Sequence, residues 1–195
     1  MPTDNSYLSD KVFLRLNNLP DKKNITVLDC YQGRGLIWAW VKALSQKNIR
    51  TIGIEKRNLG FALPGDNIDY LASLDLSLFD AIDLDAYGVP FDQLDYVFSE
   101  GYQGIIYVTF IQSIFGGLPN KLYENLGYPP EMYTKAKTMF SKHGFAKFCQ
   151  YLAMRGVKKI SYRSHKRKYY LAFNCAEESE ADLDIPQGER VEDHV

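Results

Sequence analysis

The sequence predicts an α/β fold built on a mostly parallel sheet. Short apolar runs alternate with longer segments of 3.6-residue periodicity, as strands alternate with helices in such folds. Two strands joined by a basic turn follow this alternating region. Since 195 residues with 46% hydrophobic content allow one full core, we expect a single domain over residues 1–175.

The first part of the chain supplies the predicted parallel strands. The expected elements, in order, are strand 25–31, helix 35–48, strand 50–56, a weaker third strand near 67–71, strand 79–85, a helix after Pro90 and strand 104–112. In the first helix Ile37, Trp38, Val41 and Leu44 line one face, and we expect both Trp38 and Trp40 in the core.

The second part is expected to be less regular. Residues 113–130 are rich in Gly, Pro and Asn, which favours a long loop. A helix is expected over 131–154, and 158–175 indicates a hairpin with a basic turn. Because an antiparallel hairpin is unusual at the end of an α/β chain, it favours the α/β folds that include one over those that are parallel throughout.

Charge is distributed unevenly along the chain. Residues 121–175 carry twelve lysines and arginines against two glutamates, whereas 176–195 carry eight acids and one arginine. The acidic stretch is typical of a solvated, flexible tail. The basic stretch indicates either an ordinary solvated surface or attraction to a polyanion such as RNA or DNA.

Several sequence features indicate the type of protein and its cellular compartment. Cys30, Cys149 and Cys175 lack the spacing of a disulfide framework or a zinc site, so we expect neither a disulfide nor a bound metal. No signal peptide and no apolar run of membrane-spanning length is found in the sequence. We therefore expect a cytoplasmic protein without a membrane partner, and the sequence leaves its oligomeric state open.

A glycine turn after the first strand carries the first chemical signal. Asp29 ends the strand in "VLDCYQGRG", and Gly33 and Gly35 turn the chain into the helix. Glycines there let a ligand approach the backbone amides at a helix N-terminus. A dinucleotide site expects a third glycine where this chain has Trp38, which disfavours a dehydrogenase.

Glu55 ends the second strand, twenty residues after Gly35. A carboxylate in this position is suited to accept hydrogen bonds from both ribose hydroxyls of an adenosine. The alternative is a surface carboxylate paired with Lys56 or Arg57.

This pattern resembles the class I methyltransferases that use S-adenosylmethionine, over residues 24–175. The resemblance implies a Rossmann-like, mostly parallel seven-stranded sheet with an antiparallel terminal hairpin and helices on both faces. It also implies S-adenosylmethionine as cofactor, with Asp29, Gly33 and Gly35 facing its methionine part and Glu55 its ribose. Asp66 of "GDN" would lie near the adenine, or it would instead cap a turn.

The stretch "FDAIDLDAYGVP" at 79–90 is similar to the D-x-D-P-Y/F-G-x-P motif of tRNA guanine-N2 dimethyltransferases. The similarity implies a cofactor-side acid at Asp83 and a catalytic group of Asp85, Ala86 and Tyr87. A carboxylate and a carbonyl would hold the target amine while the ring stacks on the base. Ala86 departs from the family, which has proline there. The alternative is that both aspartates cap the next helix and Tyr87 fills core.

The hairpin mixes cations with tyrosines, a combination suited to phosphate contacts and base stacking. The candidate nucleic-acid-binding residues are Lys158, Lys159, Arg163, Lys166, Arg167 and Lys168. A solvated turn with core tyrosines is the competing interpretation. The sequence thus favours an N-methyltransferase acting on a nucleic-acid base, similar to a guanine in tRNA. Methylation of a protein or small-molecule amine, or a non-catalytic adapter that binds RNA or protein, are the alternatives.

Overall fold

The computed structural model describes residues 7–112, 117–136, 138–140 and 142–175. Its helices are α1 (Leu8–Asn17), α2 (Leu36–Leu44), α3 (Asn67–Ser73), α4 (Phe91–Ser99), α5 (Asn120–Asn125), α6 (Pro130–Lys135) and α7 (Gly144–Met154), with a 3₁₀ turn η1 (Leu76–Leu78). Its strands are β1 (Asn24–Asp29), β2 (Asn48–Glu55), β3 (Leu63–Pro64), β4 (Ala81–Leu84), β5 (Ile105–Ile111), β6 (Ile160–His165) and β7 (Lys168–Asn174).

The seven strands form one sheet in the order β3-β2-β1-β4-β5-β7-β6. Strands β1 to β5 pair in parallel, whereas β7 is antiparallel to both β5 and β6. This topology confirms the predicted Rossmann-like methyltransferase fold with its antiparallel hairpin. The strand order reverses between β1 and β4, and ligands of open α/β sheets bind at the carboxyl ends of the strands at such a point.

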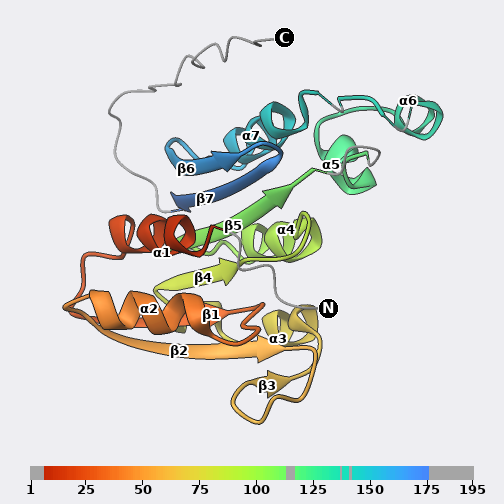
Figure 1. The fold of residues 1–195 in the computed structure, drawn as a ribbon. Coiled ribbons are helices and arrows are strands. Elements are labelled where there is room, and N and C mark those ends of the chain that lie inside the picture. The colour runs from red at the N-terminus through yellow and green to blue at the C-terminus, as the bar shows by residue number, and fades with distance from the viewer. Residues whose placement is uncertain (1–6, 113–116, 137, 141, 176–195) are drawn as a thin grey trace.

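Helices cover both faces of the sheet (Figure 1). On one face α1 and α2 pack Val12, Leu14, Trp38 and Val41 against alternate residues of the central strands. On the other face α3, α4 and α7 contribute Leu71, Leu94, Val97, Phe148 and Leu152 to the larger core cluster. Alternation along each strand decides the face, so Asp29 and Asp83 lie on the α1 and α2 face.

Three sequence expectations about elements are corrected by the structure. Residues 67–71 form α3 rather than a strand, because the Asp66 carboxylate accepts the Ile68 amide at 3.2 Å and starts the helix. The third strand is the short β3. The expected loop 113–130 contains α5, and residues 113–116 lie outside the described part of the chain. The expected helix 131–154 divides into α6 and α7, and Phe140 between them has a left-handed backbone.

Two apolar side chains of α2 were expected inside but lie outside. Trp38 is 1% exposed, whereas Trp40 is 52% and Leu44 56% exposed. The helix meets the sheet along Ile37, Trp38 and Val41, and Trp40 lies about 200° around the axis from Trp38. Helix α1, which the sequence analysis did not identify, packs beside α2 on the same face.

Candidate active site

The glycine turn and Glu55 meet at the carboxyl ends of β1 and β2. Gly33 and Gly35 have φ of 52° and 68°, a left-handed conformation that explains glycine at both positions. The Gly33 amide donates to Glu55 Oε2 at 3.0 Å, and the Arg57 amide approaches Oε1 at 3.4 Å. Glu55 therefore faces the turn as well as its neighbour Arg57, whose Nε lies 3.7 Å from Oε1.

Gln32 fills the space between the turn and β2. A Cβ at Gly53 would lie 1.4 Å from Gln32 Oε1, so any larger residue at position 53 would require the Gln32 side chain to move. Gln32 Oε1 is buried and accepts no hydrogen bond within the described residues. An orphaned acceptor beside the glycine turn is available to a donor on a ligand. The sequence analysis did not identify Gln32 as a site residue.

Asp29 and Asp83 lie side by side on β1 and β4, as register partners in the parallel pair. Both are buried, at 5% and 1% exposure. Asp29 Oδ1 accepts the Tyr31 amide at 3.2 Å. Burial, and after it the neighbouring Asp83 carboxylate, hold the pKa of Asp29 well above its ordinary value. Burial and the neighbouring carboxylate thus disfavour the charged form of Asp29, and a cation placed beside it would favour that form again.

Both carboxylate oxygens of Asp83 accept hydrogen bonds from other side chains of the protein. Arg15 of α1 donates Nε to Oδ2 and Nη2 to Oδ1, each at 2.7 Å, and Trp38 Nε1 donates to Oδ2 at 2.7 Å. Arg15 is itself 2% exposed, and it also donates Nη1 to the Lys11 carbonyl. Asp83 therefore ties α1 and α2 to the sheet and supports the site from inside.

Asp85 is bound by Lys11 of the same helix. The Lys11 Nζ lies 3.0 Å from Oδ1 and 2.9 Å from Oδ2, and Thr109 Oγ1 donates to Oδ1. The Asp85 side chain is 7% exposed. Any amine held by Asp85 would therefore share this carboxylate with, or take it from, the Lys11 ammonium.

Solvent exposure increases along the residues that follow Asp85. Ala86 is 8% exposed, and its amide donates to the Leu84 carbonyl at 2.8 Å. Tyr87 is 83% exposed, so its ring is open for stacking. Neither aspartate caps α4, whose N-cap is Pro90 without a side-chain hydrogen bond. The alternative of helix caps with a core tyrosine is therefore wrong.

Asp66 is the N-cap of helix α3, whereas the alternative in the sequence analysis was a role in capping a turn. Its neighbour Asn67 is 8% exposed and links three segments. Asn67 Nδ2 donates to the Cys30 carbonyl at 3.1 Å, and its Oδ1 accepts Gln93 Nε2 at 3.0 Å. Asn67 and Gln93 thereby fix α3 and α4 against the end of β1, and neither was identified from the sequence.

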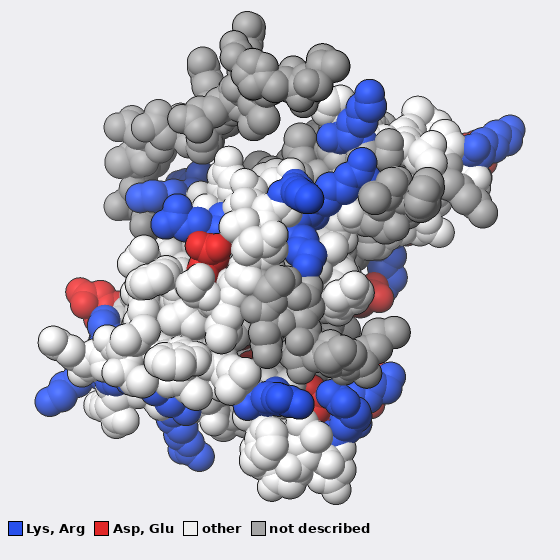
Figure 2. Space-filling view, viewed as in Figure 1, with Lys and Arg blue, Asp and Glu red and all other residues white. Residues whose placement is uncertain are grey.

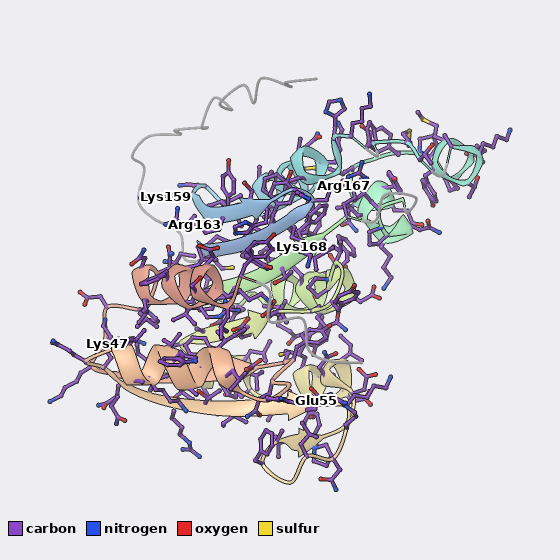
Figure 3. The ribbon with its side chains drawn as sticks, viewed as in Figure 1. Lys47, Glu55, Lys159, Arg163, Arg167 and Lys168 are labelled. Carbon is purple, nitrogen blue, oxygen red and sulfur yellow. The ribbon has the colours of Figure 1, made fainter. Side chains whose placement is uncertain are left out.

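The basic hairpin lies at one end of the strand order and runs along the whole length of β5, from the carboxyl edge of the sheet to its amino edge (Figure 3). Lys168 pairs with Ile111 at the carboxyl end of β5, and the Gln112 amide donates to the Arg167 carbonyl. Lys166 and Arg167 in the turn therefore lie at the same edge as Glu55, about 19 Å away across four strand spacings. Lys158 and Lys159 precede β6 at the opposite edge, and Arg163 lies between.

Lys11 and Arg15 are the main site residues that the sequence analysis missed. Their spacing of four places both on one face of a helix. That spacing is visible in "LSDKVFLRLN" at 8–17, but the acids they bind are about seventy residues further along the chain. Only the packing of α1 over the sheet brings these groups together.

Away from the glycine turn, the described residues contain a large cavity and two half-buried thiols. A cavity of about 610 Å³ lies at the opposite, amino-terminal edge of the sheet, lined in part by Lys22, Asp80 and Tyr102. Burial raises the pKa of the Cys149 thiol to about 11 and that of Cys175 to about 12, so both are protonated at neutral pH. The described residues hold no group of three potential metal ligands. Nor do they include a helix long and apolar enough to cross a membrane.

Known structures share this fold at low sequence identity. A ribosomal protein L11 methylase from Lactobacillus delbrueckii subsp. bulgaricus is 15% identical, with 87% of this chain and 79% of that chain covered and a TM-score of 0.51. A possible exported protein from Bordetella parapertussis is 9% identical, with 88% and 68% covered and a TM-score of 0.51. No protein-family model and no curated protein sequence matches the chain.

The methyltransferase subunit of a type I restriction-modification system from Streptococcus thermophilus gives the same TM-score of 0.51 at 10% identity. The match covers 86% of this chain but 43% of that subunit. Identities this low show a shared fold, the Rossmann-like methyltransferase fold, and nothing finer.

Proposed function

We propose that the protein is an S-adenosylmethionine-dependent methyltransferase that transfers a methyl group to an amine nitrogen of a nucleic-acid base. One observation carries the proposal. Asp29, the left-handed Gly33 and Gly35 turn, and Glu55 meet at the strand-order reversal of a sheet that contains an antiparallel β7. This is where open α/β sheets bind ligands.

The residues at this edge fit the cofactor. Glu55 would accept hydrogen bonds from the ribose hydroxyls, and the buried Gln32 Oε1 lacks a donor that a ligand would supply. The turn leads directly into the N-terminus of α2, whose N-cap is Gly35, and the Asp29 carboxylate would bind the ammonium of the methionine part. When bound, the cofactor supplies a methyl group on a positively charged sulfur. A nitrogen lone pair can attack this methyl carbon, and the sulfur then leaves as a neutral thioether.

A nicotinamide dinucleotide fits this chain less well. The third glycine of its phosphate-binding turn would fall at Trp38, a buried indole whose Nε1 donates to Asp83. Trp38 thus supports the site acids instead of opening the helix to a pyrophosphate.

The acceptor side is proposed at the end of β4. Tyr87 presents an open ring for base stacking, which contributes about 1–3 kcal/mol per base. The Ala86 carbonyl and the Asp85 carboxylate would accept hydrogen bonds from the target amine and aim its nitrogen. Since Lys11 neutralises Asp85, the carboxylate serves to orient the amine rather than to remove its proton.

The nucleic-acid part of the proposal is supported by the position of the hairpin turn. Lys166 and Arg167 are exposed at the edge that contains Tyr87 and Glu55. Figure 2, which looks onto the face covered by α1 and α2, shows further Lys and Arg side chains scattered over that face. Phosphates held at the turn would keep a neighbouring nucleotide within reach of β4.

Nucleoside analysis by mass spectrometry tests this function. We expect total RNA or DNA from cells that lack the protein to lose one N-methylated nucleoside. The purified protein with S-adenosylmethionine should restore that nucleoside in the same RNA or DNA. Unchanged nucleosides, together with methylation of a protein or small amine by the purified enzyme, would contradict the assignment of the acceptor.

A further inference from the structure

Helix α2 is apolar on both its buried and its exposed sides. Lys42 is the single charged residue in "LIWAWVKAL". Its inner side packs Trp38 and Val41 on the sheet. A helix that is apolar all round is normally enclosed on every side, and one with an open apolar side indicates a missing partner.

The open side forms a continuous stripe. Leu36, Trp40 and Leu44 follow one another at one-turn intervals and are 36%, 52% and 56% exposed. The eight residue steps from Leu36 to Leu44 make the stripe about 12 Å long. Ala39 and Ala43 are also exposed and lie next to it, one turn apart. Large side chains beside a row of small ones form the ridge and groove into which a second helix packs.

The exposed charges on and directly beside α2 are mostly positive. No aspartate or glutamate occurs between residues 30 and 54, whereas Arg34 and Lys42 are exposed beside and on α2. Lys47, just beyond its carboxyl end and labelled in Figure 3, lies 3.7 Å from the exposed carboxylate of Asp21, so among the described residues the unpaired positive charge of this surface comes from Arg34 and Lys42. Figure 2 shows the resulting surface, white over α2 with blue along its lower margin. Such a surface complements an apolar face flanked by carboxylates.

We propose that the outer face of α2, formed by Leu36, Ala39, Trp40, Ala43 and Leu44, docks an amphipathic helix of a partner protein whose apolar stripe is flanked by acidic residues. The proposal is independent of the proposed methyl transfer. Its consequence for the site is direct, because the same helix carries Trp38, which binds Asp83. A partner on α2 would hold the element that supports the buried acids.

Two other occupants fit this surface less well. A second copy joined by a two-fold axis would bring the cationic margins of two α2 helices together, and like charges disfavour that contact. A nucleic acid would satisfy the cations and stack on Trp40. It would leave the leucines at both ends of the stripe without an apolar partner.

Site-specific photocrosslinking tests the proposal. A photoreactive phenylalanine derivative would replace Trp40 in the full chain in its native host, and the matched control would carry it at Leu78. Leu78 is 69% exposed on η1 at the amino-terminal edge of the sheet. We expect one protein adduct from position 40 and none from position 78.

The captured protein, once purified, should bind the wild-type chain in calorimetry. Its Kd should rise at least tenfold between low and high salt, and at least tenfold in the variant Leu36→Ser/Leu44→Ser. The variant Leu78→Ser should bind as wild type. Circular dichroism would verify that all variants fold.

A cross-link to a second copy or to nucleic acid would overturn the proposal, as would the absence of any adduct. An adduct whose binding is insensitive to both salt and Leu36→Ser/Leu44→Ser would also overturn it.

Discussion

Arg15 donates two hydrogen bonds of 2.7 Å to the Asp83 carboxylate, one from Nε and one from Nη2, and both side chains are almost fully buried. This pair joins α1, which precedes the sheet, to the strand that carries the proposed acceptor motif. It shows that the helix before β1 is an integral part of the site. The first prediction follows from this contact.

Removing Arg15 should destabilise the protein strongly. In Arg15→Met the Asp83 carboxylate stays buried without its cation, and breaking a buried pair in this way costs about 3–5 kcal/mol. The double variant Arg15→Met/Asp83→Leu should recover most of that loss, because no unpaired charge remains. Urea unfolding measures each free energy of unfolding.

The matched control is Lys22, which contacts Asp80 with a side chain 65% exposed. Lys22→Met should change the free energy of unfolding by at most about 1 kcal/mol. Equal losses in Arg15→Met and Lys22→Met would contradict the structural role of Arg15.

Most of the fold was predictable because its signals are local. The strands around β1, β2, β4 and β5 are apolar runs bounded by polar turns, and the hairpin has a basic turn between two alternating strands. The antiparallel β7 then restricted the topology. Residues 67–71 were mistaken for a strand because the Asp66 cap, which starts α3, was weighed as a turn signal instead.

The site was predictable in part for the same reason. Asp29, Gly33 and Glu55 belong to segments whose spacing alone places them at one edge of a sheet. Lys11, Gln32 and Asn67 are defined by contacts with distant residues, and nothing within a short window predicts those contacts. The exposure of Trp40 was missed because both sides of α2 are apolar, so periodicity did not distinguish them.

Asp29 should make stability depend on pH. Its raised pKa means that the folded protein keeps a proton that the unfolded chain releases above about pH 4. Stability from this group is therefore complete below about pH 4 and is lost as pH rises toward the folded pKa. Asp29→Asn removes that dependence. Relative to wild type, the free energy of unfolding of this variant should therefore increase as the pH rises from 4 to 8.

Cofactor binding by Asp29→Asn should show the opposite change. If the carboxylate receives the ammonium of the methionine part, affinity should fall by about 1–3 kcal/mol at neutral pH. Urea titrations at several pH values, paired with calorimetry, measure both effects. A variant that is less stable than wild type at pH 8, yet binds normally, would exclude this role.

The two ends of the hairpin should contribute unequally to nucleic-acid binding. Lys166→Gln/Arg167→Gln removes two cations from the site edge and should lower the slope of log affinity against log salt by about 2. Lys158→Gln/Lys159→Gln removes two cations from the opposite edge and should leave the slope nearly unchanged. Filter binding of RNA at several salt concentrations measures both. Equal slopes in the two variants would contradict the proposed anchoring at the turn.

Asp85 should act on the chemical step. Asp85→Ala should reduce kcat and kcat/KM together while cofactor affinity stays near wild type, as expected for a transition-state contact. The variant also leaves Lys11 without its partner, so Lys11→Met/Asp85→Ala is the companion. If Asp85 orients the amine, the double variant is stable but inactive. Full turnover in the double variant would show that Asp85 only neutralises the charge of Lys11 and does not orient the amine.

Ala86→Pro tests the departure from the family motif. Ala86 precedes Tyr87 at the proposed acceptor site, and proline would restrict the backbone there. Activity should rise if alanine leaves the carbonyl poorly fixed. The Ala86 amide donates to the Leu84 carbonyl, and proline would remove this bond at a cost of about 0.5–1.5 kcal/mol. Steady-state kinetics and urea unfolding separate the two effects, and lower activity at unchanged stability would contradict the expectation.

The central claim is that the Gly33 turn and Glu55 bind S-adenosylmethionine, and isothermal titration calorimetry tests it most directly. The wild-type chain should bind S-adenosylmethionine and S-adenosylhomocysteine at micromolar or tighter levels and should not bind NAD. Glu55→Ala should weaken binding by about 1–3 kcal/mol, whereas Glu100→Ala, an exposed acid at the opposite edge, should bind as wild type. Tight binding of NAD without binding of either methionine nucleoside, or equal affinity in Glu55→Ala and wild type, would contradict the account.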